Sequence, residues 1–336
     1  MLKVRLALTL VAASTILVAC GGGGGDDSPS PNTPLAATQA PITSANYVAV
    51  TQEALSSNAF LLDATSLVVG AQVSDSSTLI RFGQSQLSKT PGRIANASVQ
   101  AVGATQTFTE QCAGGGTLTI VDNDRNGNQQ ADAGDSVSLT ANNCSFDGEV
   151  LNGQLSVTLN SATGNFESGY PYTLSGVLSF QNLTAQSATT RVVANGSMTM
   201  TVDARSDFNQ SVALAIDSFA VSRTYAGVTS SQTLTKYNTS LKVSPTGSGA
   251  DWTSSVRGIL TSSAIDSKSV SIDTPLSFVR SGNQAYPASG QAIILGAAGS
   301  KVQVTAISST TVKIDLDADG NGTYETSVNK VWSEIL

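Results

Sequence analysis

Apolar and polar residues alternate with a period of two over most of the chain after about Val99. The apolar positions of the four clearest runs are Leu155, Val157 and Leu159; Met198, Met200 and Val202; Val212, Leu214 and Ile216; and Val312, Ile314 and Leu316. Such alternation places one face of a strand on a core and the other in water, as in antiparallel sheets. We therefore predict a mainly β protein, in which residues 99–336 form an antiparallel meander folded as a sandwich, an open barrel or a curled sheet.

Asparagine or aspartate followed by glycine recurs between these runs. Both residues of such a pair tolerate the positive φ angles that tight hairpin turns require. The pairs predict hairpin turns at Asp147-Gly148, Asn152-Gly153, Asn195-Gly196 and Asn321-Gly322.

The segment 44–98 has a different pattern and is expected to be partly helical and partly irregular. Residues 44–57 carry apolar side chains close to helical spacing, which predicts a helix there. The apolar stretch 59–69 is compatible with a helix or a strand, and residues 71–95 are polar, so we expect them to be irregular.

The first 19 residues have the pattern of an export signal. Lys3 and Arg5 precede an uncharged apolar run from Leu6 to Ala19, about 14 residues, whereas a membrane-spanning helix needs roughly 20. A basic start, a short apolar run and small residues at its end indicate a cleaved signal peptide at residues 1–19.

The run ends Leu17-Val18-Ala19-Cys20, which resembles the lipobox of bacterial lipoproteins. In that family the cysteine thiol receives a diacylglyceryl group, the signal is cut before the cysteine, and the new amine is acylated, for example with palmitate. The resemblance implies that Cys20 is lipidated and that the membrane is a partner through this anchor. An aspartate after the cysteine favours retention in the inner membrane; Gly21 stands there instead, which implies the outer membrane and leaves its periplasmic and surface faces both open.

Residues 20–43 follow as the lipidated cysteine and a tether rich in glycine and proline. Glycine-rich linkers are flexible and proline-rich ones are stiffer. A run of glycines after the lipobox also resembles uncharacterised proteobacterial β-rich lipoproteins.

The charge of the mature part argues against several partners. It lacks Lys3 and Arg5, so it has two fewer basic residues than the whole chain's 17, against 24 acidic ones, and a formal net charge of −9. Nucleic acids and anionic membrane surfaces attract basic patches, so we expect no nucleic-acid partner. A protein or saccharide partner is compatible with the composition, which does not choose between them.

Cys112 and Cys144 remain once Cys20 is assigned to lipid. An even number of cysteines in an exported protein favours a disulfide, so we predict a bond between this pair.

Two acidic, glycine-containing segments resemble the first half of an EF-hand calcium loop. They read Asp122-x-Asp124-x-Asn126-Gly127 and Asp317-x-Asp319-x-Asn321-Gly322. Calcium takes six to eight oxygen ligands, and acids at alternate positions wrap around one point while glycine permits the turn. The resemblance implies a structural Ca²⁺ ion in each loop.

Both segments depart from the family at the twelfth position, where Ala133 and Val328 replace the bidentate glutamate. Asp132 or Asp135 compensates in the first, and Glu325 in the second. The complete candidate ligand set is Asp122, Asp124, Asn126, Asn128, Asp132, Asp135, Asp317, Asp319, Asn321 and Glu325. The alternative is ordinary turn chemistry, because Asp, Asn and Gly dominate turns that bind no metal.

The chain contains no histidine, which excludes Ser-His-Asp and Cys-His catalysis and histidine-based metal sites. We therefore expect no catalytic residues and a non-enzymatic binding or structural module of the envelope. One alternative is a carrier of an apolar ligand in a curled sheet, with the Met198/Met200 strand as a wall. A less favoured one is a carboxylate-dependent hydrolase using Asp147 with Glu149 or Asp203 with Asp207.

Overall fold

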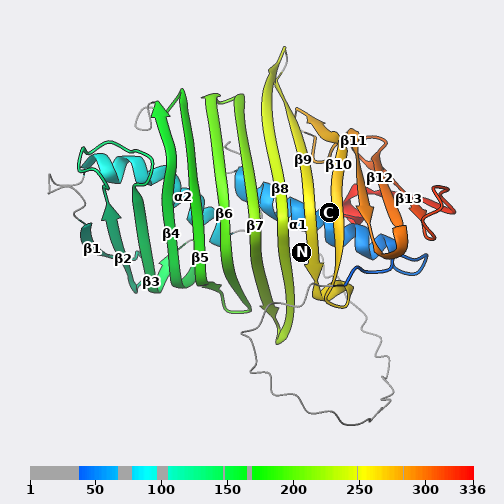
Figure 1. The fold of residues 1–336 in the computed structure, drawn as a ribbon, viewed down its shortest axis with the longest axis horizontal. Helices are drawn as coiled ribbons and strands as arrows, with labels where there is room; N and C mark the ends of the chain where they lie inside the picture. The colour runs from blue at the N-terminus through cyan, green and yellow to red at the C-terminus, as the bar shows by residue number, and fades with distance from the viewer. Residues whose placement is uncertain are drawn as a thin grey trace, which may run out of the picture. The chain divides into compact units, whose positions relative to one another are not determined.

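Two helices precede fourteen strands in the computed structural model, which describes residues 38–66, 78–96, 105–146, 148–164, 169–247, 249–282 and 284–336 (Figure 1). The helices are α1 (Tyr47–Ser66) and α2 (Thr78–Asn96), and three short 3-10 helices are η2 (Ser263–Ile265), η3 (Ala297–Gly299) and η4 (Trp332–Glu334). The strands are β1 (Thr105–Gln111), β2 (Thr117–Asn123), β3 (Ser136–Phe146), β4 (Glu149–Gly164), β5 (Tyr172–Gln186), β6 (Thr190–Ser206), β7 (Asn209–Tyr225), β8 (Val228–Thr246), β9 (Gly249–Ser262), β10 (Lys268–Ser281), β11 (Ser289–Leu295), β12 (Lys301–Ala306), β13 (Thr311–Asp317) and β14 (Thr326–Val331).

All fourteen strands belong to one open sheet, in which each strand pairs antiparallel with its neighbours in sequence. β1 and β14 are the two edges, so the sheet is not closed into a barrel. The predicted antiparallel meander is confirmed, and a sandwich of two sheets is not what forms. The apolar positions of the four alternating runs are all buried, as their period of two predicts.

The two faces of the sheet differ because the helices cover one of them, called here the closed face. α2 contacts β2, β4 and β5, while α1 contacts β8, β9 and β12, and both helices lie behind the strands in Figure 1. The helices and the inward-facing side chains share one hydrophobic core. The opposite face, called here the open face, carries mainly serine, threonine, asparagine and glutamine on the central strands.

Helix α2 approaches the sheet closely because a glycine lies on each side of the contact. A Cβ atom at Gly83 of α2 would lie 3.2 Å from the Phe180 ring of β5. A Cβ atom at Gly176 of β5 would lie 2.8 Å from Cδ1 of Leu87 of α2. Larger residues at either glycine would hold the helix away from the strands.

The expectation that residues 71–95 are irregular is wrong for residues 78–95, which belong to helix α2. Its buried face includes Leu79, Phe82, Leu87 and Ile94, but also polar side chains such as Gln86. Pro91 lies within it, and proline ordinarily disfavours a helix interior. The contacts with the sheet therefore stabilise a helix that local sequence does not predict.

Two of the four predicted hairpin turns lie inside strands instead, opposite β-bulges of the neighbouring strands. Gly153 lies inside β4 and Gly196 inside β6, both with positive φ angles beside interruptions in the register, where the extra residue belongs to the neighbouring strand, β3 or β5. Asn152 and Asn195, the residues before them, accept hydrogen bonds through Oδ1 from the backbone N–H groups of the adjacent strands. Bulges bend a sheet and increase its twist. Three residues at such bulges also have positive φ angles, namely Asn143 in β3, Asn182 in β5 and Lys236 in β8.

Candidate cation loops and an open sheet face

The β13–β14 loop brings together three of the predicted calcium ligands. One carboxylate oxygen from each of Asp317, Asp319 and Glu325 lies within 4.8 Å of the others. Among the residues that the structure describes, no other group of three acidic side chains brings its oxygens this close together. Asn321 lies in the same turn, where its Nδ2 donates to Oδ2 of Asp319 over 2.9 Å.

Asp317 is fully buried and its carboxylate is fully engaged. Its Oδ1 accepts from the N–H of Gly320 at 2.8 Å, and its Oδ2 accepts from that of Gly322 at 2.9 Å. The Lys301 ammonium of β12 lies 3.0 Å from Oδ2. Burial acts to raise the pKa of Asp317, but the bond from Lys301 and those backbone donors outweigh it, so the pKa is lowered.

Lys301 therefore stands where a cation would approach Asp317. Its bond to Asp317 raises the pKa of the ammonium, which keeps it charged. A Ca²⁺ ion binding to both Asp317 and Asp319 has to compete with this ammonium for one carboxylate.

The β2–β3 loop, residues 124–135, is organised differently. Asp124 accepts hydrogen bonds from the N–H groups of Gly127 (2.8 Å) and Gln129 (2.7 Å). Buried Asp135 likewise accepts from the N–H groups of Arg125 (2.9 Å) and Asp132 (2.7 Å). The two carboxylates thus hold the loop by binding its backbone, in the manner of turns that contain no metal.

Three other predicted ligands of this loop meet one another. Oδ2 of Asp132 accepts from Nδ2 of Asn126 at 3.0 Å and from Nδ2 of Asn128 at 2.7 Å. These amide donors lower the pKa of Asp132. Successive connections of a meander lie at alternate ends of its strands, so this loop and the β13–β14 loop lie at opposite ends of the sheet.

Asp122 belongs to β2 and faces the core, on the same side of the strand as Leu118 and Ile120. Its buried Oδ1 accepts no hydrogen bond from a described residue. Burial raises the pKa of this carboxyl, the charge of Arg93 in α2 acts to lower it, and Glu110 acts to raise it. The sequence motif does not reveal that its first acid points towards α2.

The predicted disulfide is in place. Cys112 follows β1 and Cys144 lies in β3, and the bond joins Cα atoms 5.3 Å apart. It therefore links the end of the edge strand β1 covalently to β3, two strands away in the sheet. Cys20, the predicted lipidation site, and the signal and tether up to residue 37 lie outside the described residues, and neither described helix is long and apolar enough to cross a bilayer.

The described residues named for the alternative functions have the following surroundings. Met198 and Met200 are each 1% exposed and pack in the hydrophobic core beneath the helices. Asp203 forms an ion pair with Arg205, with Oδ1 and Nε 2.6 Å apart. Asp147 lies outside the described residues.

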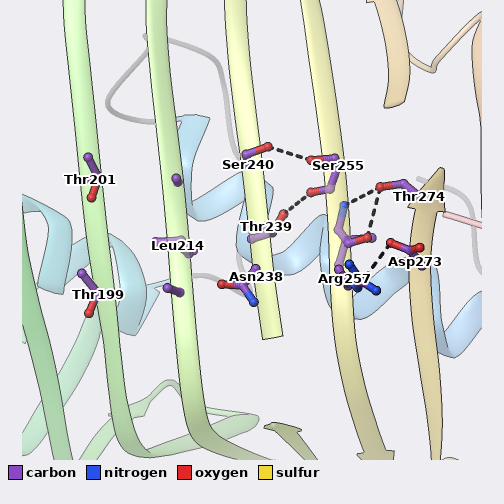
Figure 2. A pocket seen from close by; sticks show the side chains of 13 residues that line it. Thr199, Thr201, Leu214, Asn238, Thr239, Ser240, Ser255, Arg257, Asp273 and Thr274 are labelled. Carbon is purple, nitrogen blue, oxygen red and sulfur yellow. Dashed lines mark hydrogen bonds and ion pairs between the residues drawn. The ribbon is translucent and has the colours of Figure 1, made fainter. Parts of the chain in front are cut away.

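A groove in the centre of the open face was not predicted from the sequence. It has a volume of about 290 Å³ and is lined by residues of five neighbouring strands, β6 to β10 (Figure 2). Thr199 and Thr201 of β6 form one wall of the groove. Asn238 and Ser240 line it from β8, two strands away. Between them β7 contributes Ala213, Leu214 and Ala215, and the surface is hollow here because its outward-facing side chains, Ala213 and Ala215, are single methyl groups.

The far wall of the groove forms where β9 and β10 separate. Their regular pairing stops between Val270 and Phe278 of β10. In this gap the Thr274 hydroxyl replaces a strand contact: it accepts from the Val256 N–H at 2.8 Å and donates to the Val256 carbonyl at 3.1 Å. Figure 2 shows Arg257 and Asp273 at this wall.

Comparison of the chain with protein-family models, with curated proteins and with solved structures finds no match.

Proposed function

We propose that the protein is a non-enzymatic binding module, held at the outer membrane through lipid on Cys20, with the open face of its sheet as the binding surface. The observation that carries the proposal is the difference between the two faces. Helices α1 and α2 seal the closed face into a core, whereas the open face presents polar side chains around a groove. Concave sites with a few convergent polar groups are the usual places for ligands.

A binding role also agrees with the chemistry of the chain. The protein has no histidine, and the cysteines of the folded part are joined to each other. Nucleophilic catalysis based on His or a free thiolate therefore has no residues to use.

The surface assignment is tested by photo-crosslinking in intact cells. A photoreactive amino acid replaces Thr201 on the open face or, as the control, exposed Ser88 on helix α2. The proposal expects a discrete crosslinked envelope component from position 201 and none from position 88. The same crosslinks from both positions, or none from position 201, would refute the assignment.

The lipid anchor has its own test. Radiolabelled palmitate should be incorporated into the wild-type chain, and the label should fractionate with outer membranes. Cys20→Ser should abolish the label. A labelled Cys20→Ser chain, or a label confined to inner membranes, would contradict this part of the proposal.

We further propose that Ca²⁺ binds the β13–β14 loop and stabilises it. The convergence of Asp317, Asp319 and Glu325 supports this, since calcium prefers several carboxylate oxygens. Calcium at a hundred times its dissociation constant adds about 2.7 kcal/mol to the free energy of unfolding.

The calcium proposal is tested by thermal unfolding in millimolar calcium and in excess chelator. The calcium-dependent rise in Tm should disappear in Asp319→Ala and persist in Asp132→Ala, a carboxylate of the loop at the other end of the strands. A rise lost only in Asp132→Ala would place the ion in the β2–β3 loop, where calcium is also predicted from the sequence. Identical melts in both buffers would remove calcium from both loops.

A further inference from the structure

The groove on the open face combines hydroxyl, amide and charged groups around a small apolar floor. Hydroxyls come from Thr199, Thr201 and Ser240, the amide comes from Asn238, and Ala213 with its neighbour on β7 provides methyl groups at the base. Hydroxyl and amide groups both donate and accept hydrogen bonds. A ligand that fits this lining must itself offer donors and acceptors around its rim and an apolar surface at its centre.

Arg257 and Asp273 contribute one positive and one negative charge, which form a long ion pair. The Arg257 side chain is 80% exposed and that of Asp273 is 51% exposed, and Nε and Oδ1 lie 3.9 Å apart. This distance is beyond that of a hydrogen bond, in contrast to the 2.6 Å between Arg205 and Asp203 elsewhere on the sheet. The guanidinium can therefore donate to a ligand while the carboxylate accepts from it.

The balance of charge and the size of the groove narrow the ligand class. One arginine offset by one aspartate gives no net attraction for a phosphate-rich or polyanionic ligand. The volume of about 290 Å³ is just below the usual range for small-molecule sites, about 300–1,000 Å³, so the groove holds a small unit only. The polar walls disfavour an apolar ligand, which would leave their donors and acceptors unpaired.

Serine residues on the neighbouring strands extend the polar surface away from the groove. Ser156 of β4, Ser179 of β5 and Ser197 of β6 lie opposite one another in the register. Adjacent strands are about 4.8 Å apart, so these hydroxyls form a row beside the groove along which further units of a polymer could lie.

We propose that the groove binds one unit of a neutral saccharide chain, a proposal that rests on the open face being the binding surface. The hydroxyls of the sugar match the hydroxyl and amide groups of the walls, and Arg257 with Asp273 supplies the strongest polar contacts. The C–H surface of the sugar ring lies over the two alanine methyl groups, and the adjoining units follow the serine row.

The test is native affinity electrophoresis of the purified full-length mature protein in gels that contain dextran, mannan, laminarin or arabinogalactan, with the polyanion alginate for comparison. At least one of the four neutral polymers should retard the wild-type protein, and alginate should not retard it more strongly. Hydrogen bonds to charged groups are strong, so Arg257→Gln should weaken the affinity about tenfold or more.

Two further variants separate binding from folding. Arg205→Gln removes an arginine from the same face outside the groove, and its affinity should stay within about twofold of the wild type. Ala213→Leu fills the floor from an exposed position and should abolish retardation while its melting temperature stays close to that of the wild type.

Retardation by no neutral polymer, equal retardation of Arg257→Gln and wild type, or stronger retardation by alginate would each overturn the saccharide proposal. Crosslinks confined to position 201 would in that case still support the open face as the binding surface. Equal crosslinking from positions 201 and 88 would instead remove the binding surface itself.

Discussion

The contact between α2 and β5 makes a sharp prediction, because glycines at Gly83 and Gly176 let helix and strand approach each other closely on the closed face. Gly176→Ala would place a methyl carbon 2.8 Å from Cδ1 of Leu87 and 3.0 Å from the carbonyl oxygen of Thr158. Carbon atoms pack best at about 3.5–4.0 Å, so the Leu87 side chain, the helix or β4 has to move. Overpacking of this kind costs about 1–3 kcal/mol, and the lower chain entropy of alanine offsets about 0.5–1 kcal/mol. We expect a net loss of about 1–2 kcal/mol in the free energy of unfolding.

Urea unfolding followed by tryptophan fluorescence measures this loss, and a double-mutant cycle locates it. Leu87→Ala alone should cost about 2–5 kcal/mol, because it leaves a cavity in the core. In the double variant the new methyl group fills part of that cavity, so the combined cost should fall short of the sum by at least about 0.5 kcal/mol. Gly92→Ala, a glycine of the same helix whose added Cβ meets nothing within 4 Å, is the matched control. It should leave stability unchanged or increase it by up to about 1 kcal/mol.

Two results would refute this reasoning. Gly176→Ala could prove as stable as the wild type, or its effect could add to that of Leu87→Ala without coupling. Either result would mean that α2 does not rest on β5 at Gly176, and the closed face would then lack the seal that directs binding to the open face.

Three further predictions concern the acids and the edge of the sheet. Asp122→Asn should raise Tm at neutral pH, because burial raises the pKa of this carboxyl above its ordinary 3.8 and folding then opposes its ionisation; the gain should fade as the pH drops through the folded pKa towards that value, and a gain independent of pH would contradict it. Replacing Cys112 and Cys144 by alanine should lower the free energy of unfolding by about 3.7 kcal/mol in the chain-entropy model for positions 32 apart, with urea curves in oxidised and reduced samples as the measurement. Lys301→Gln should enlarge the calcium-dependent rise in Tm, since its ammonium lies 3.0 Å from Asp317 and competes with the ion; an unchanged calcium titration would count against the competition.

The sheet could be predicted from the sequence because its strands have one buried and one open face. Runs such as Leu155 to Leu159 alternate cleanly for that reason. Helix α2 could not, because Gly83 and Pro91 lie within it and its buried face includes polar residues such as Gln86. Its stability comes from packing on strands later in the chain, such as β5, where Gly176 lies 89 residues after Leu87.

Asn-Gly pairs were ambiguous for a physical reason. A tight hairpin and a β-bulge both need a residue with positive φ, and glycine supplies it in either setting. Asn321-Gly322 lies in a connection between strands, whereas Gly153 and Gly196 lie within strands that continue beyond them. Only the strand pairing distinguishes the two cases.

The acidic loops could be predicted from the sequence, whereas the groove could not. The ligands of a loop are neighbours in the chain, so the motif from Asp317 to Glu325 is visible directly. The groove joins Thr199 to Asp273 across five strands, and nothing in a single strand marks its polar positions as special. Asp122 is the reverse case. It is the first acid of a motif that is visible in the sequence, but the alternation of β2 places its side chain on the core side of the strand.

The groove forms where the sheet departs from regular pairing, and this is why it is the strongest candidate for selective binding. A regular face of serine and threonine offers similar hydroxyls everywhere and so distinguishes few ligands. The bulge at Lys236, whose φ is 47°, immediately precedes the segment that carries Asn238. The break in pairing between β9 and β10 then leaves Arg257 and Asp273 at the wall. Local departures from ideal structure are expected at functional sites, because they cost stability that packing elsewhere has to supply. In this protein the sealed core under α1 and α2 supplies it.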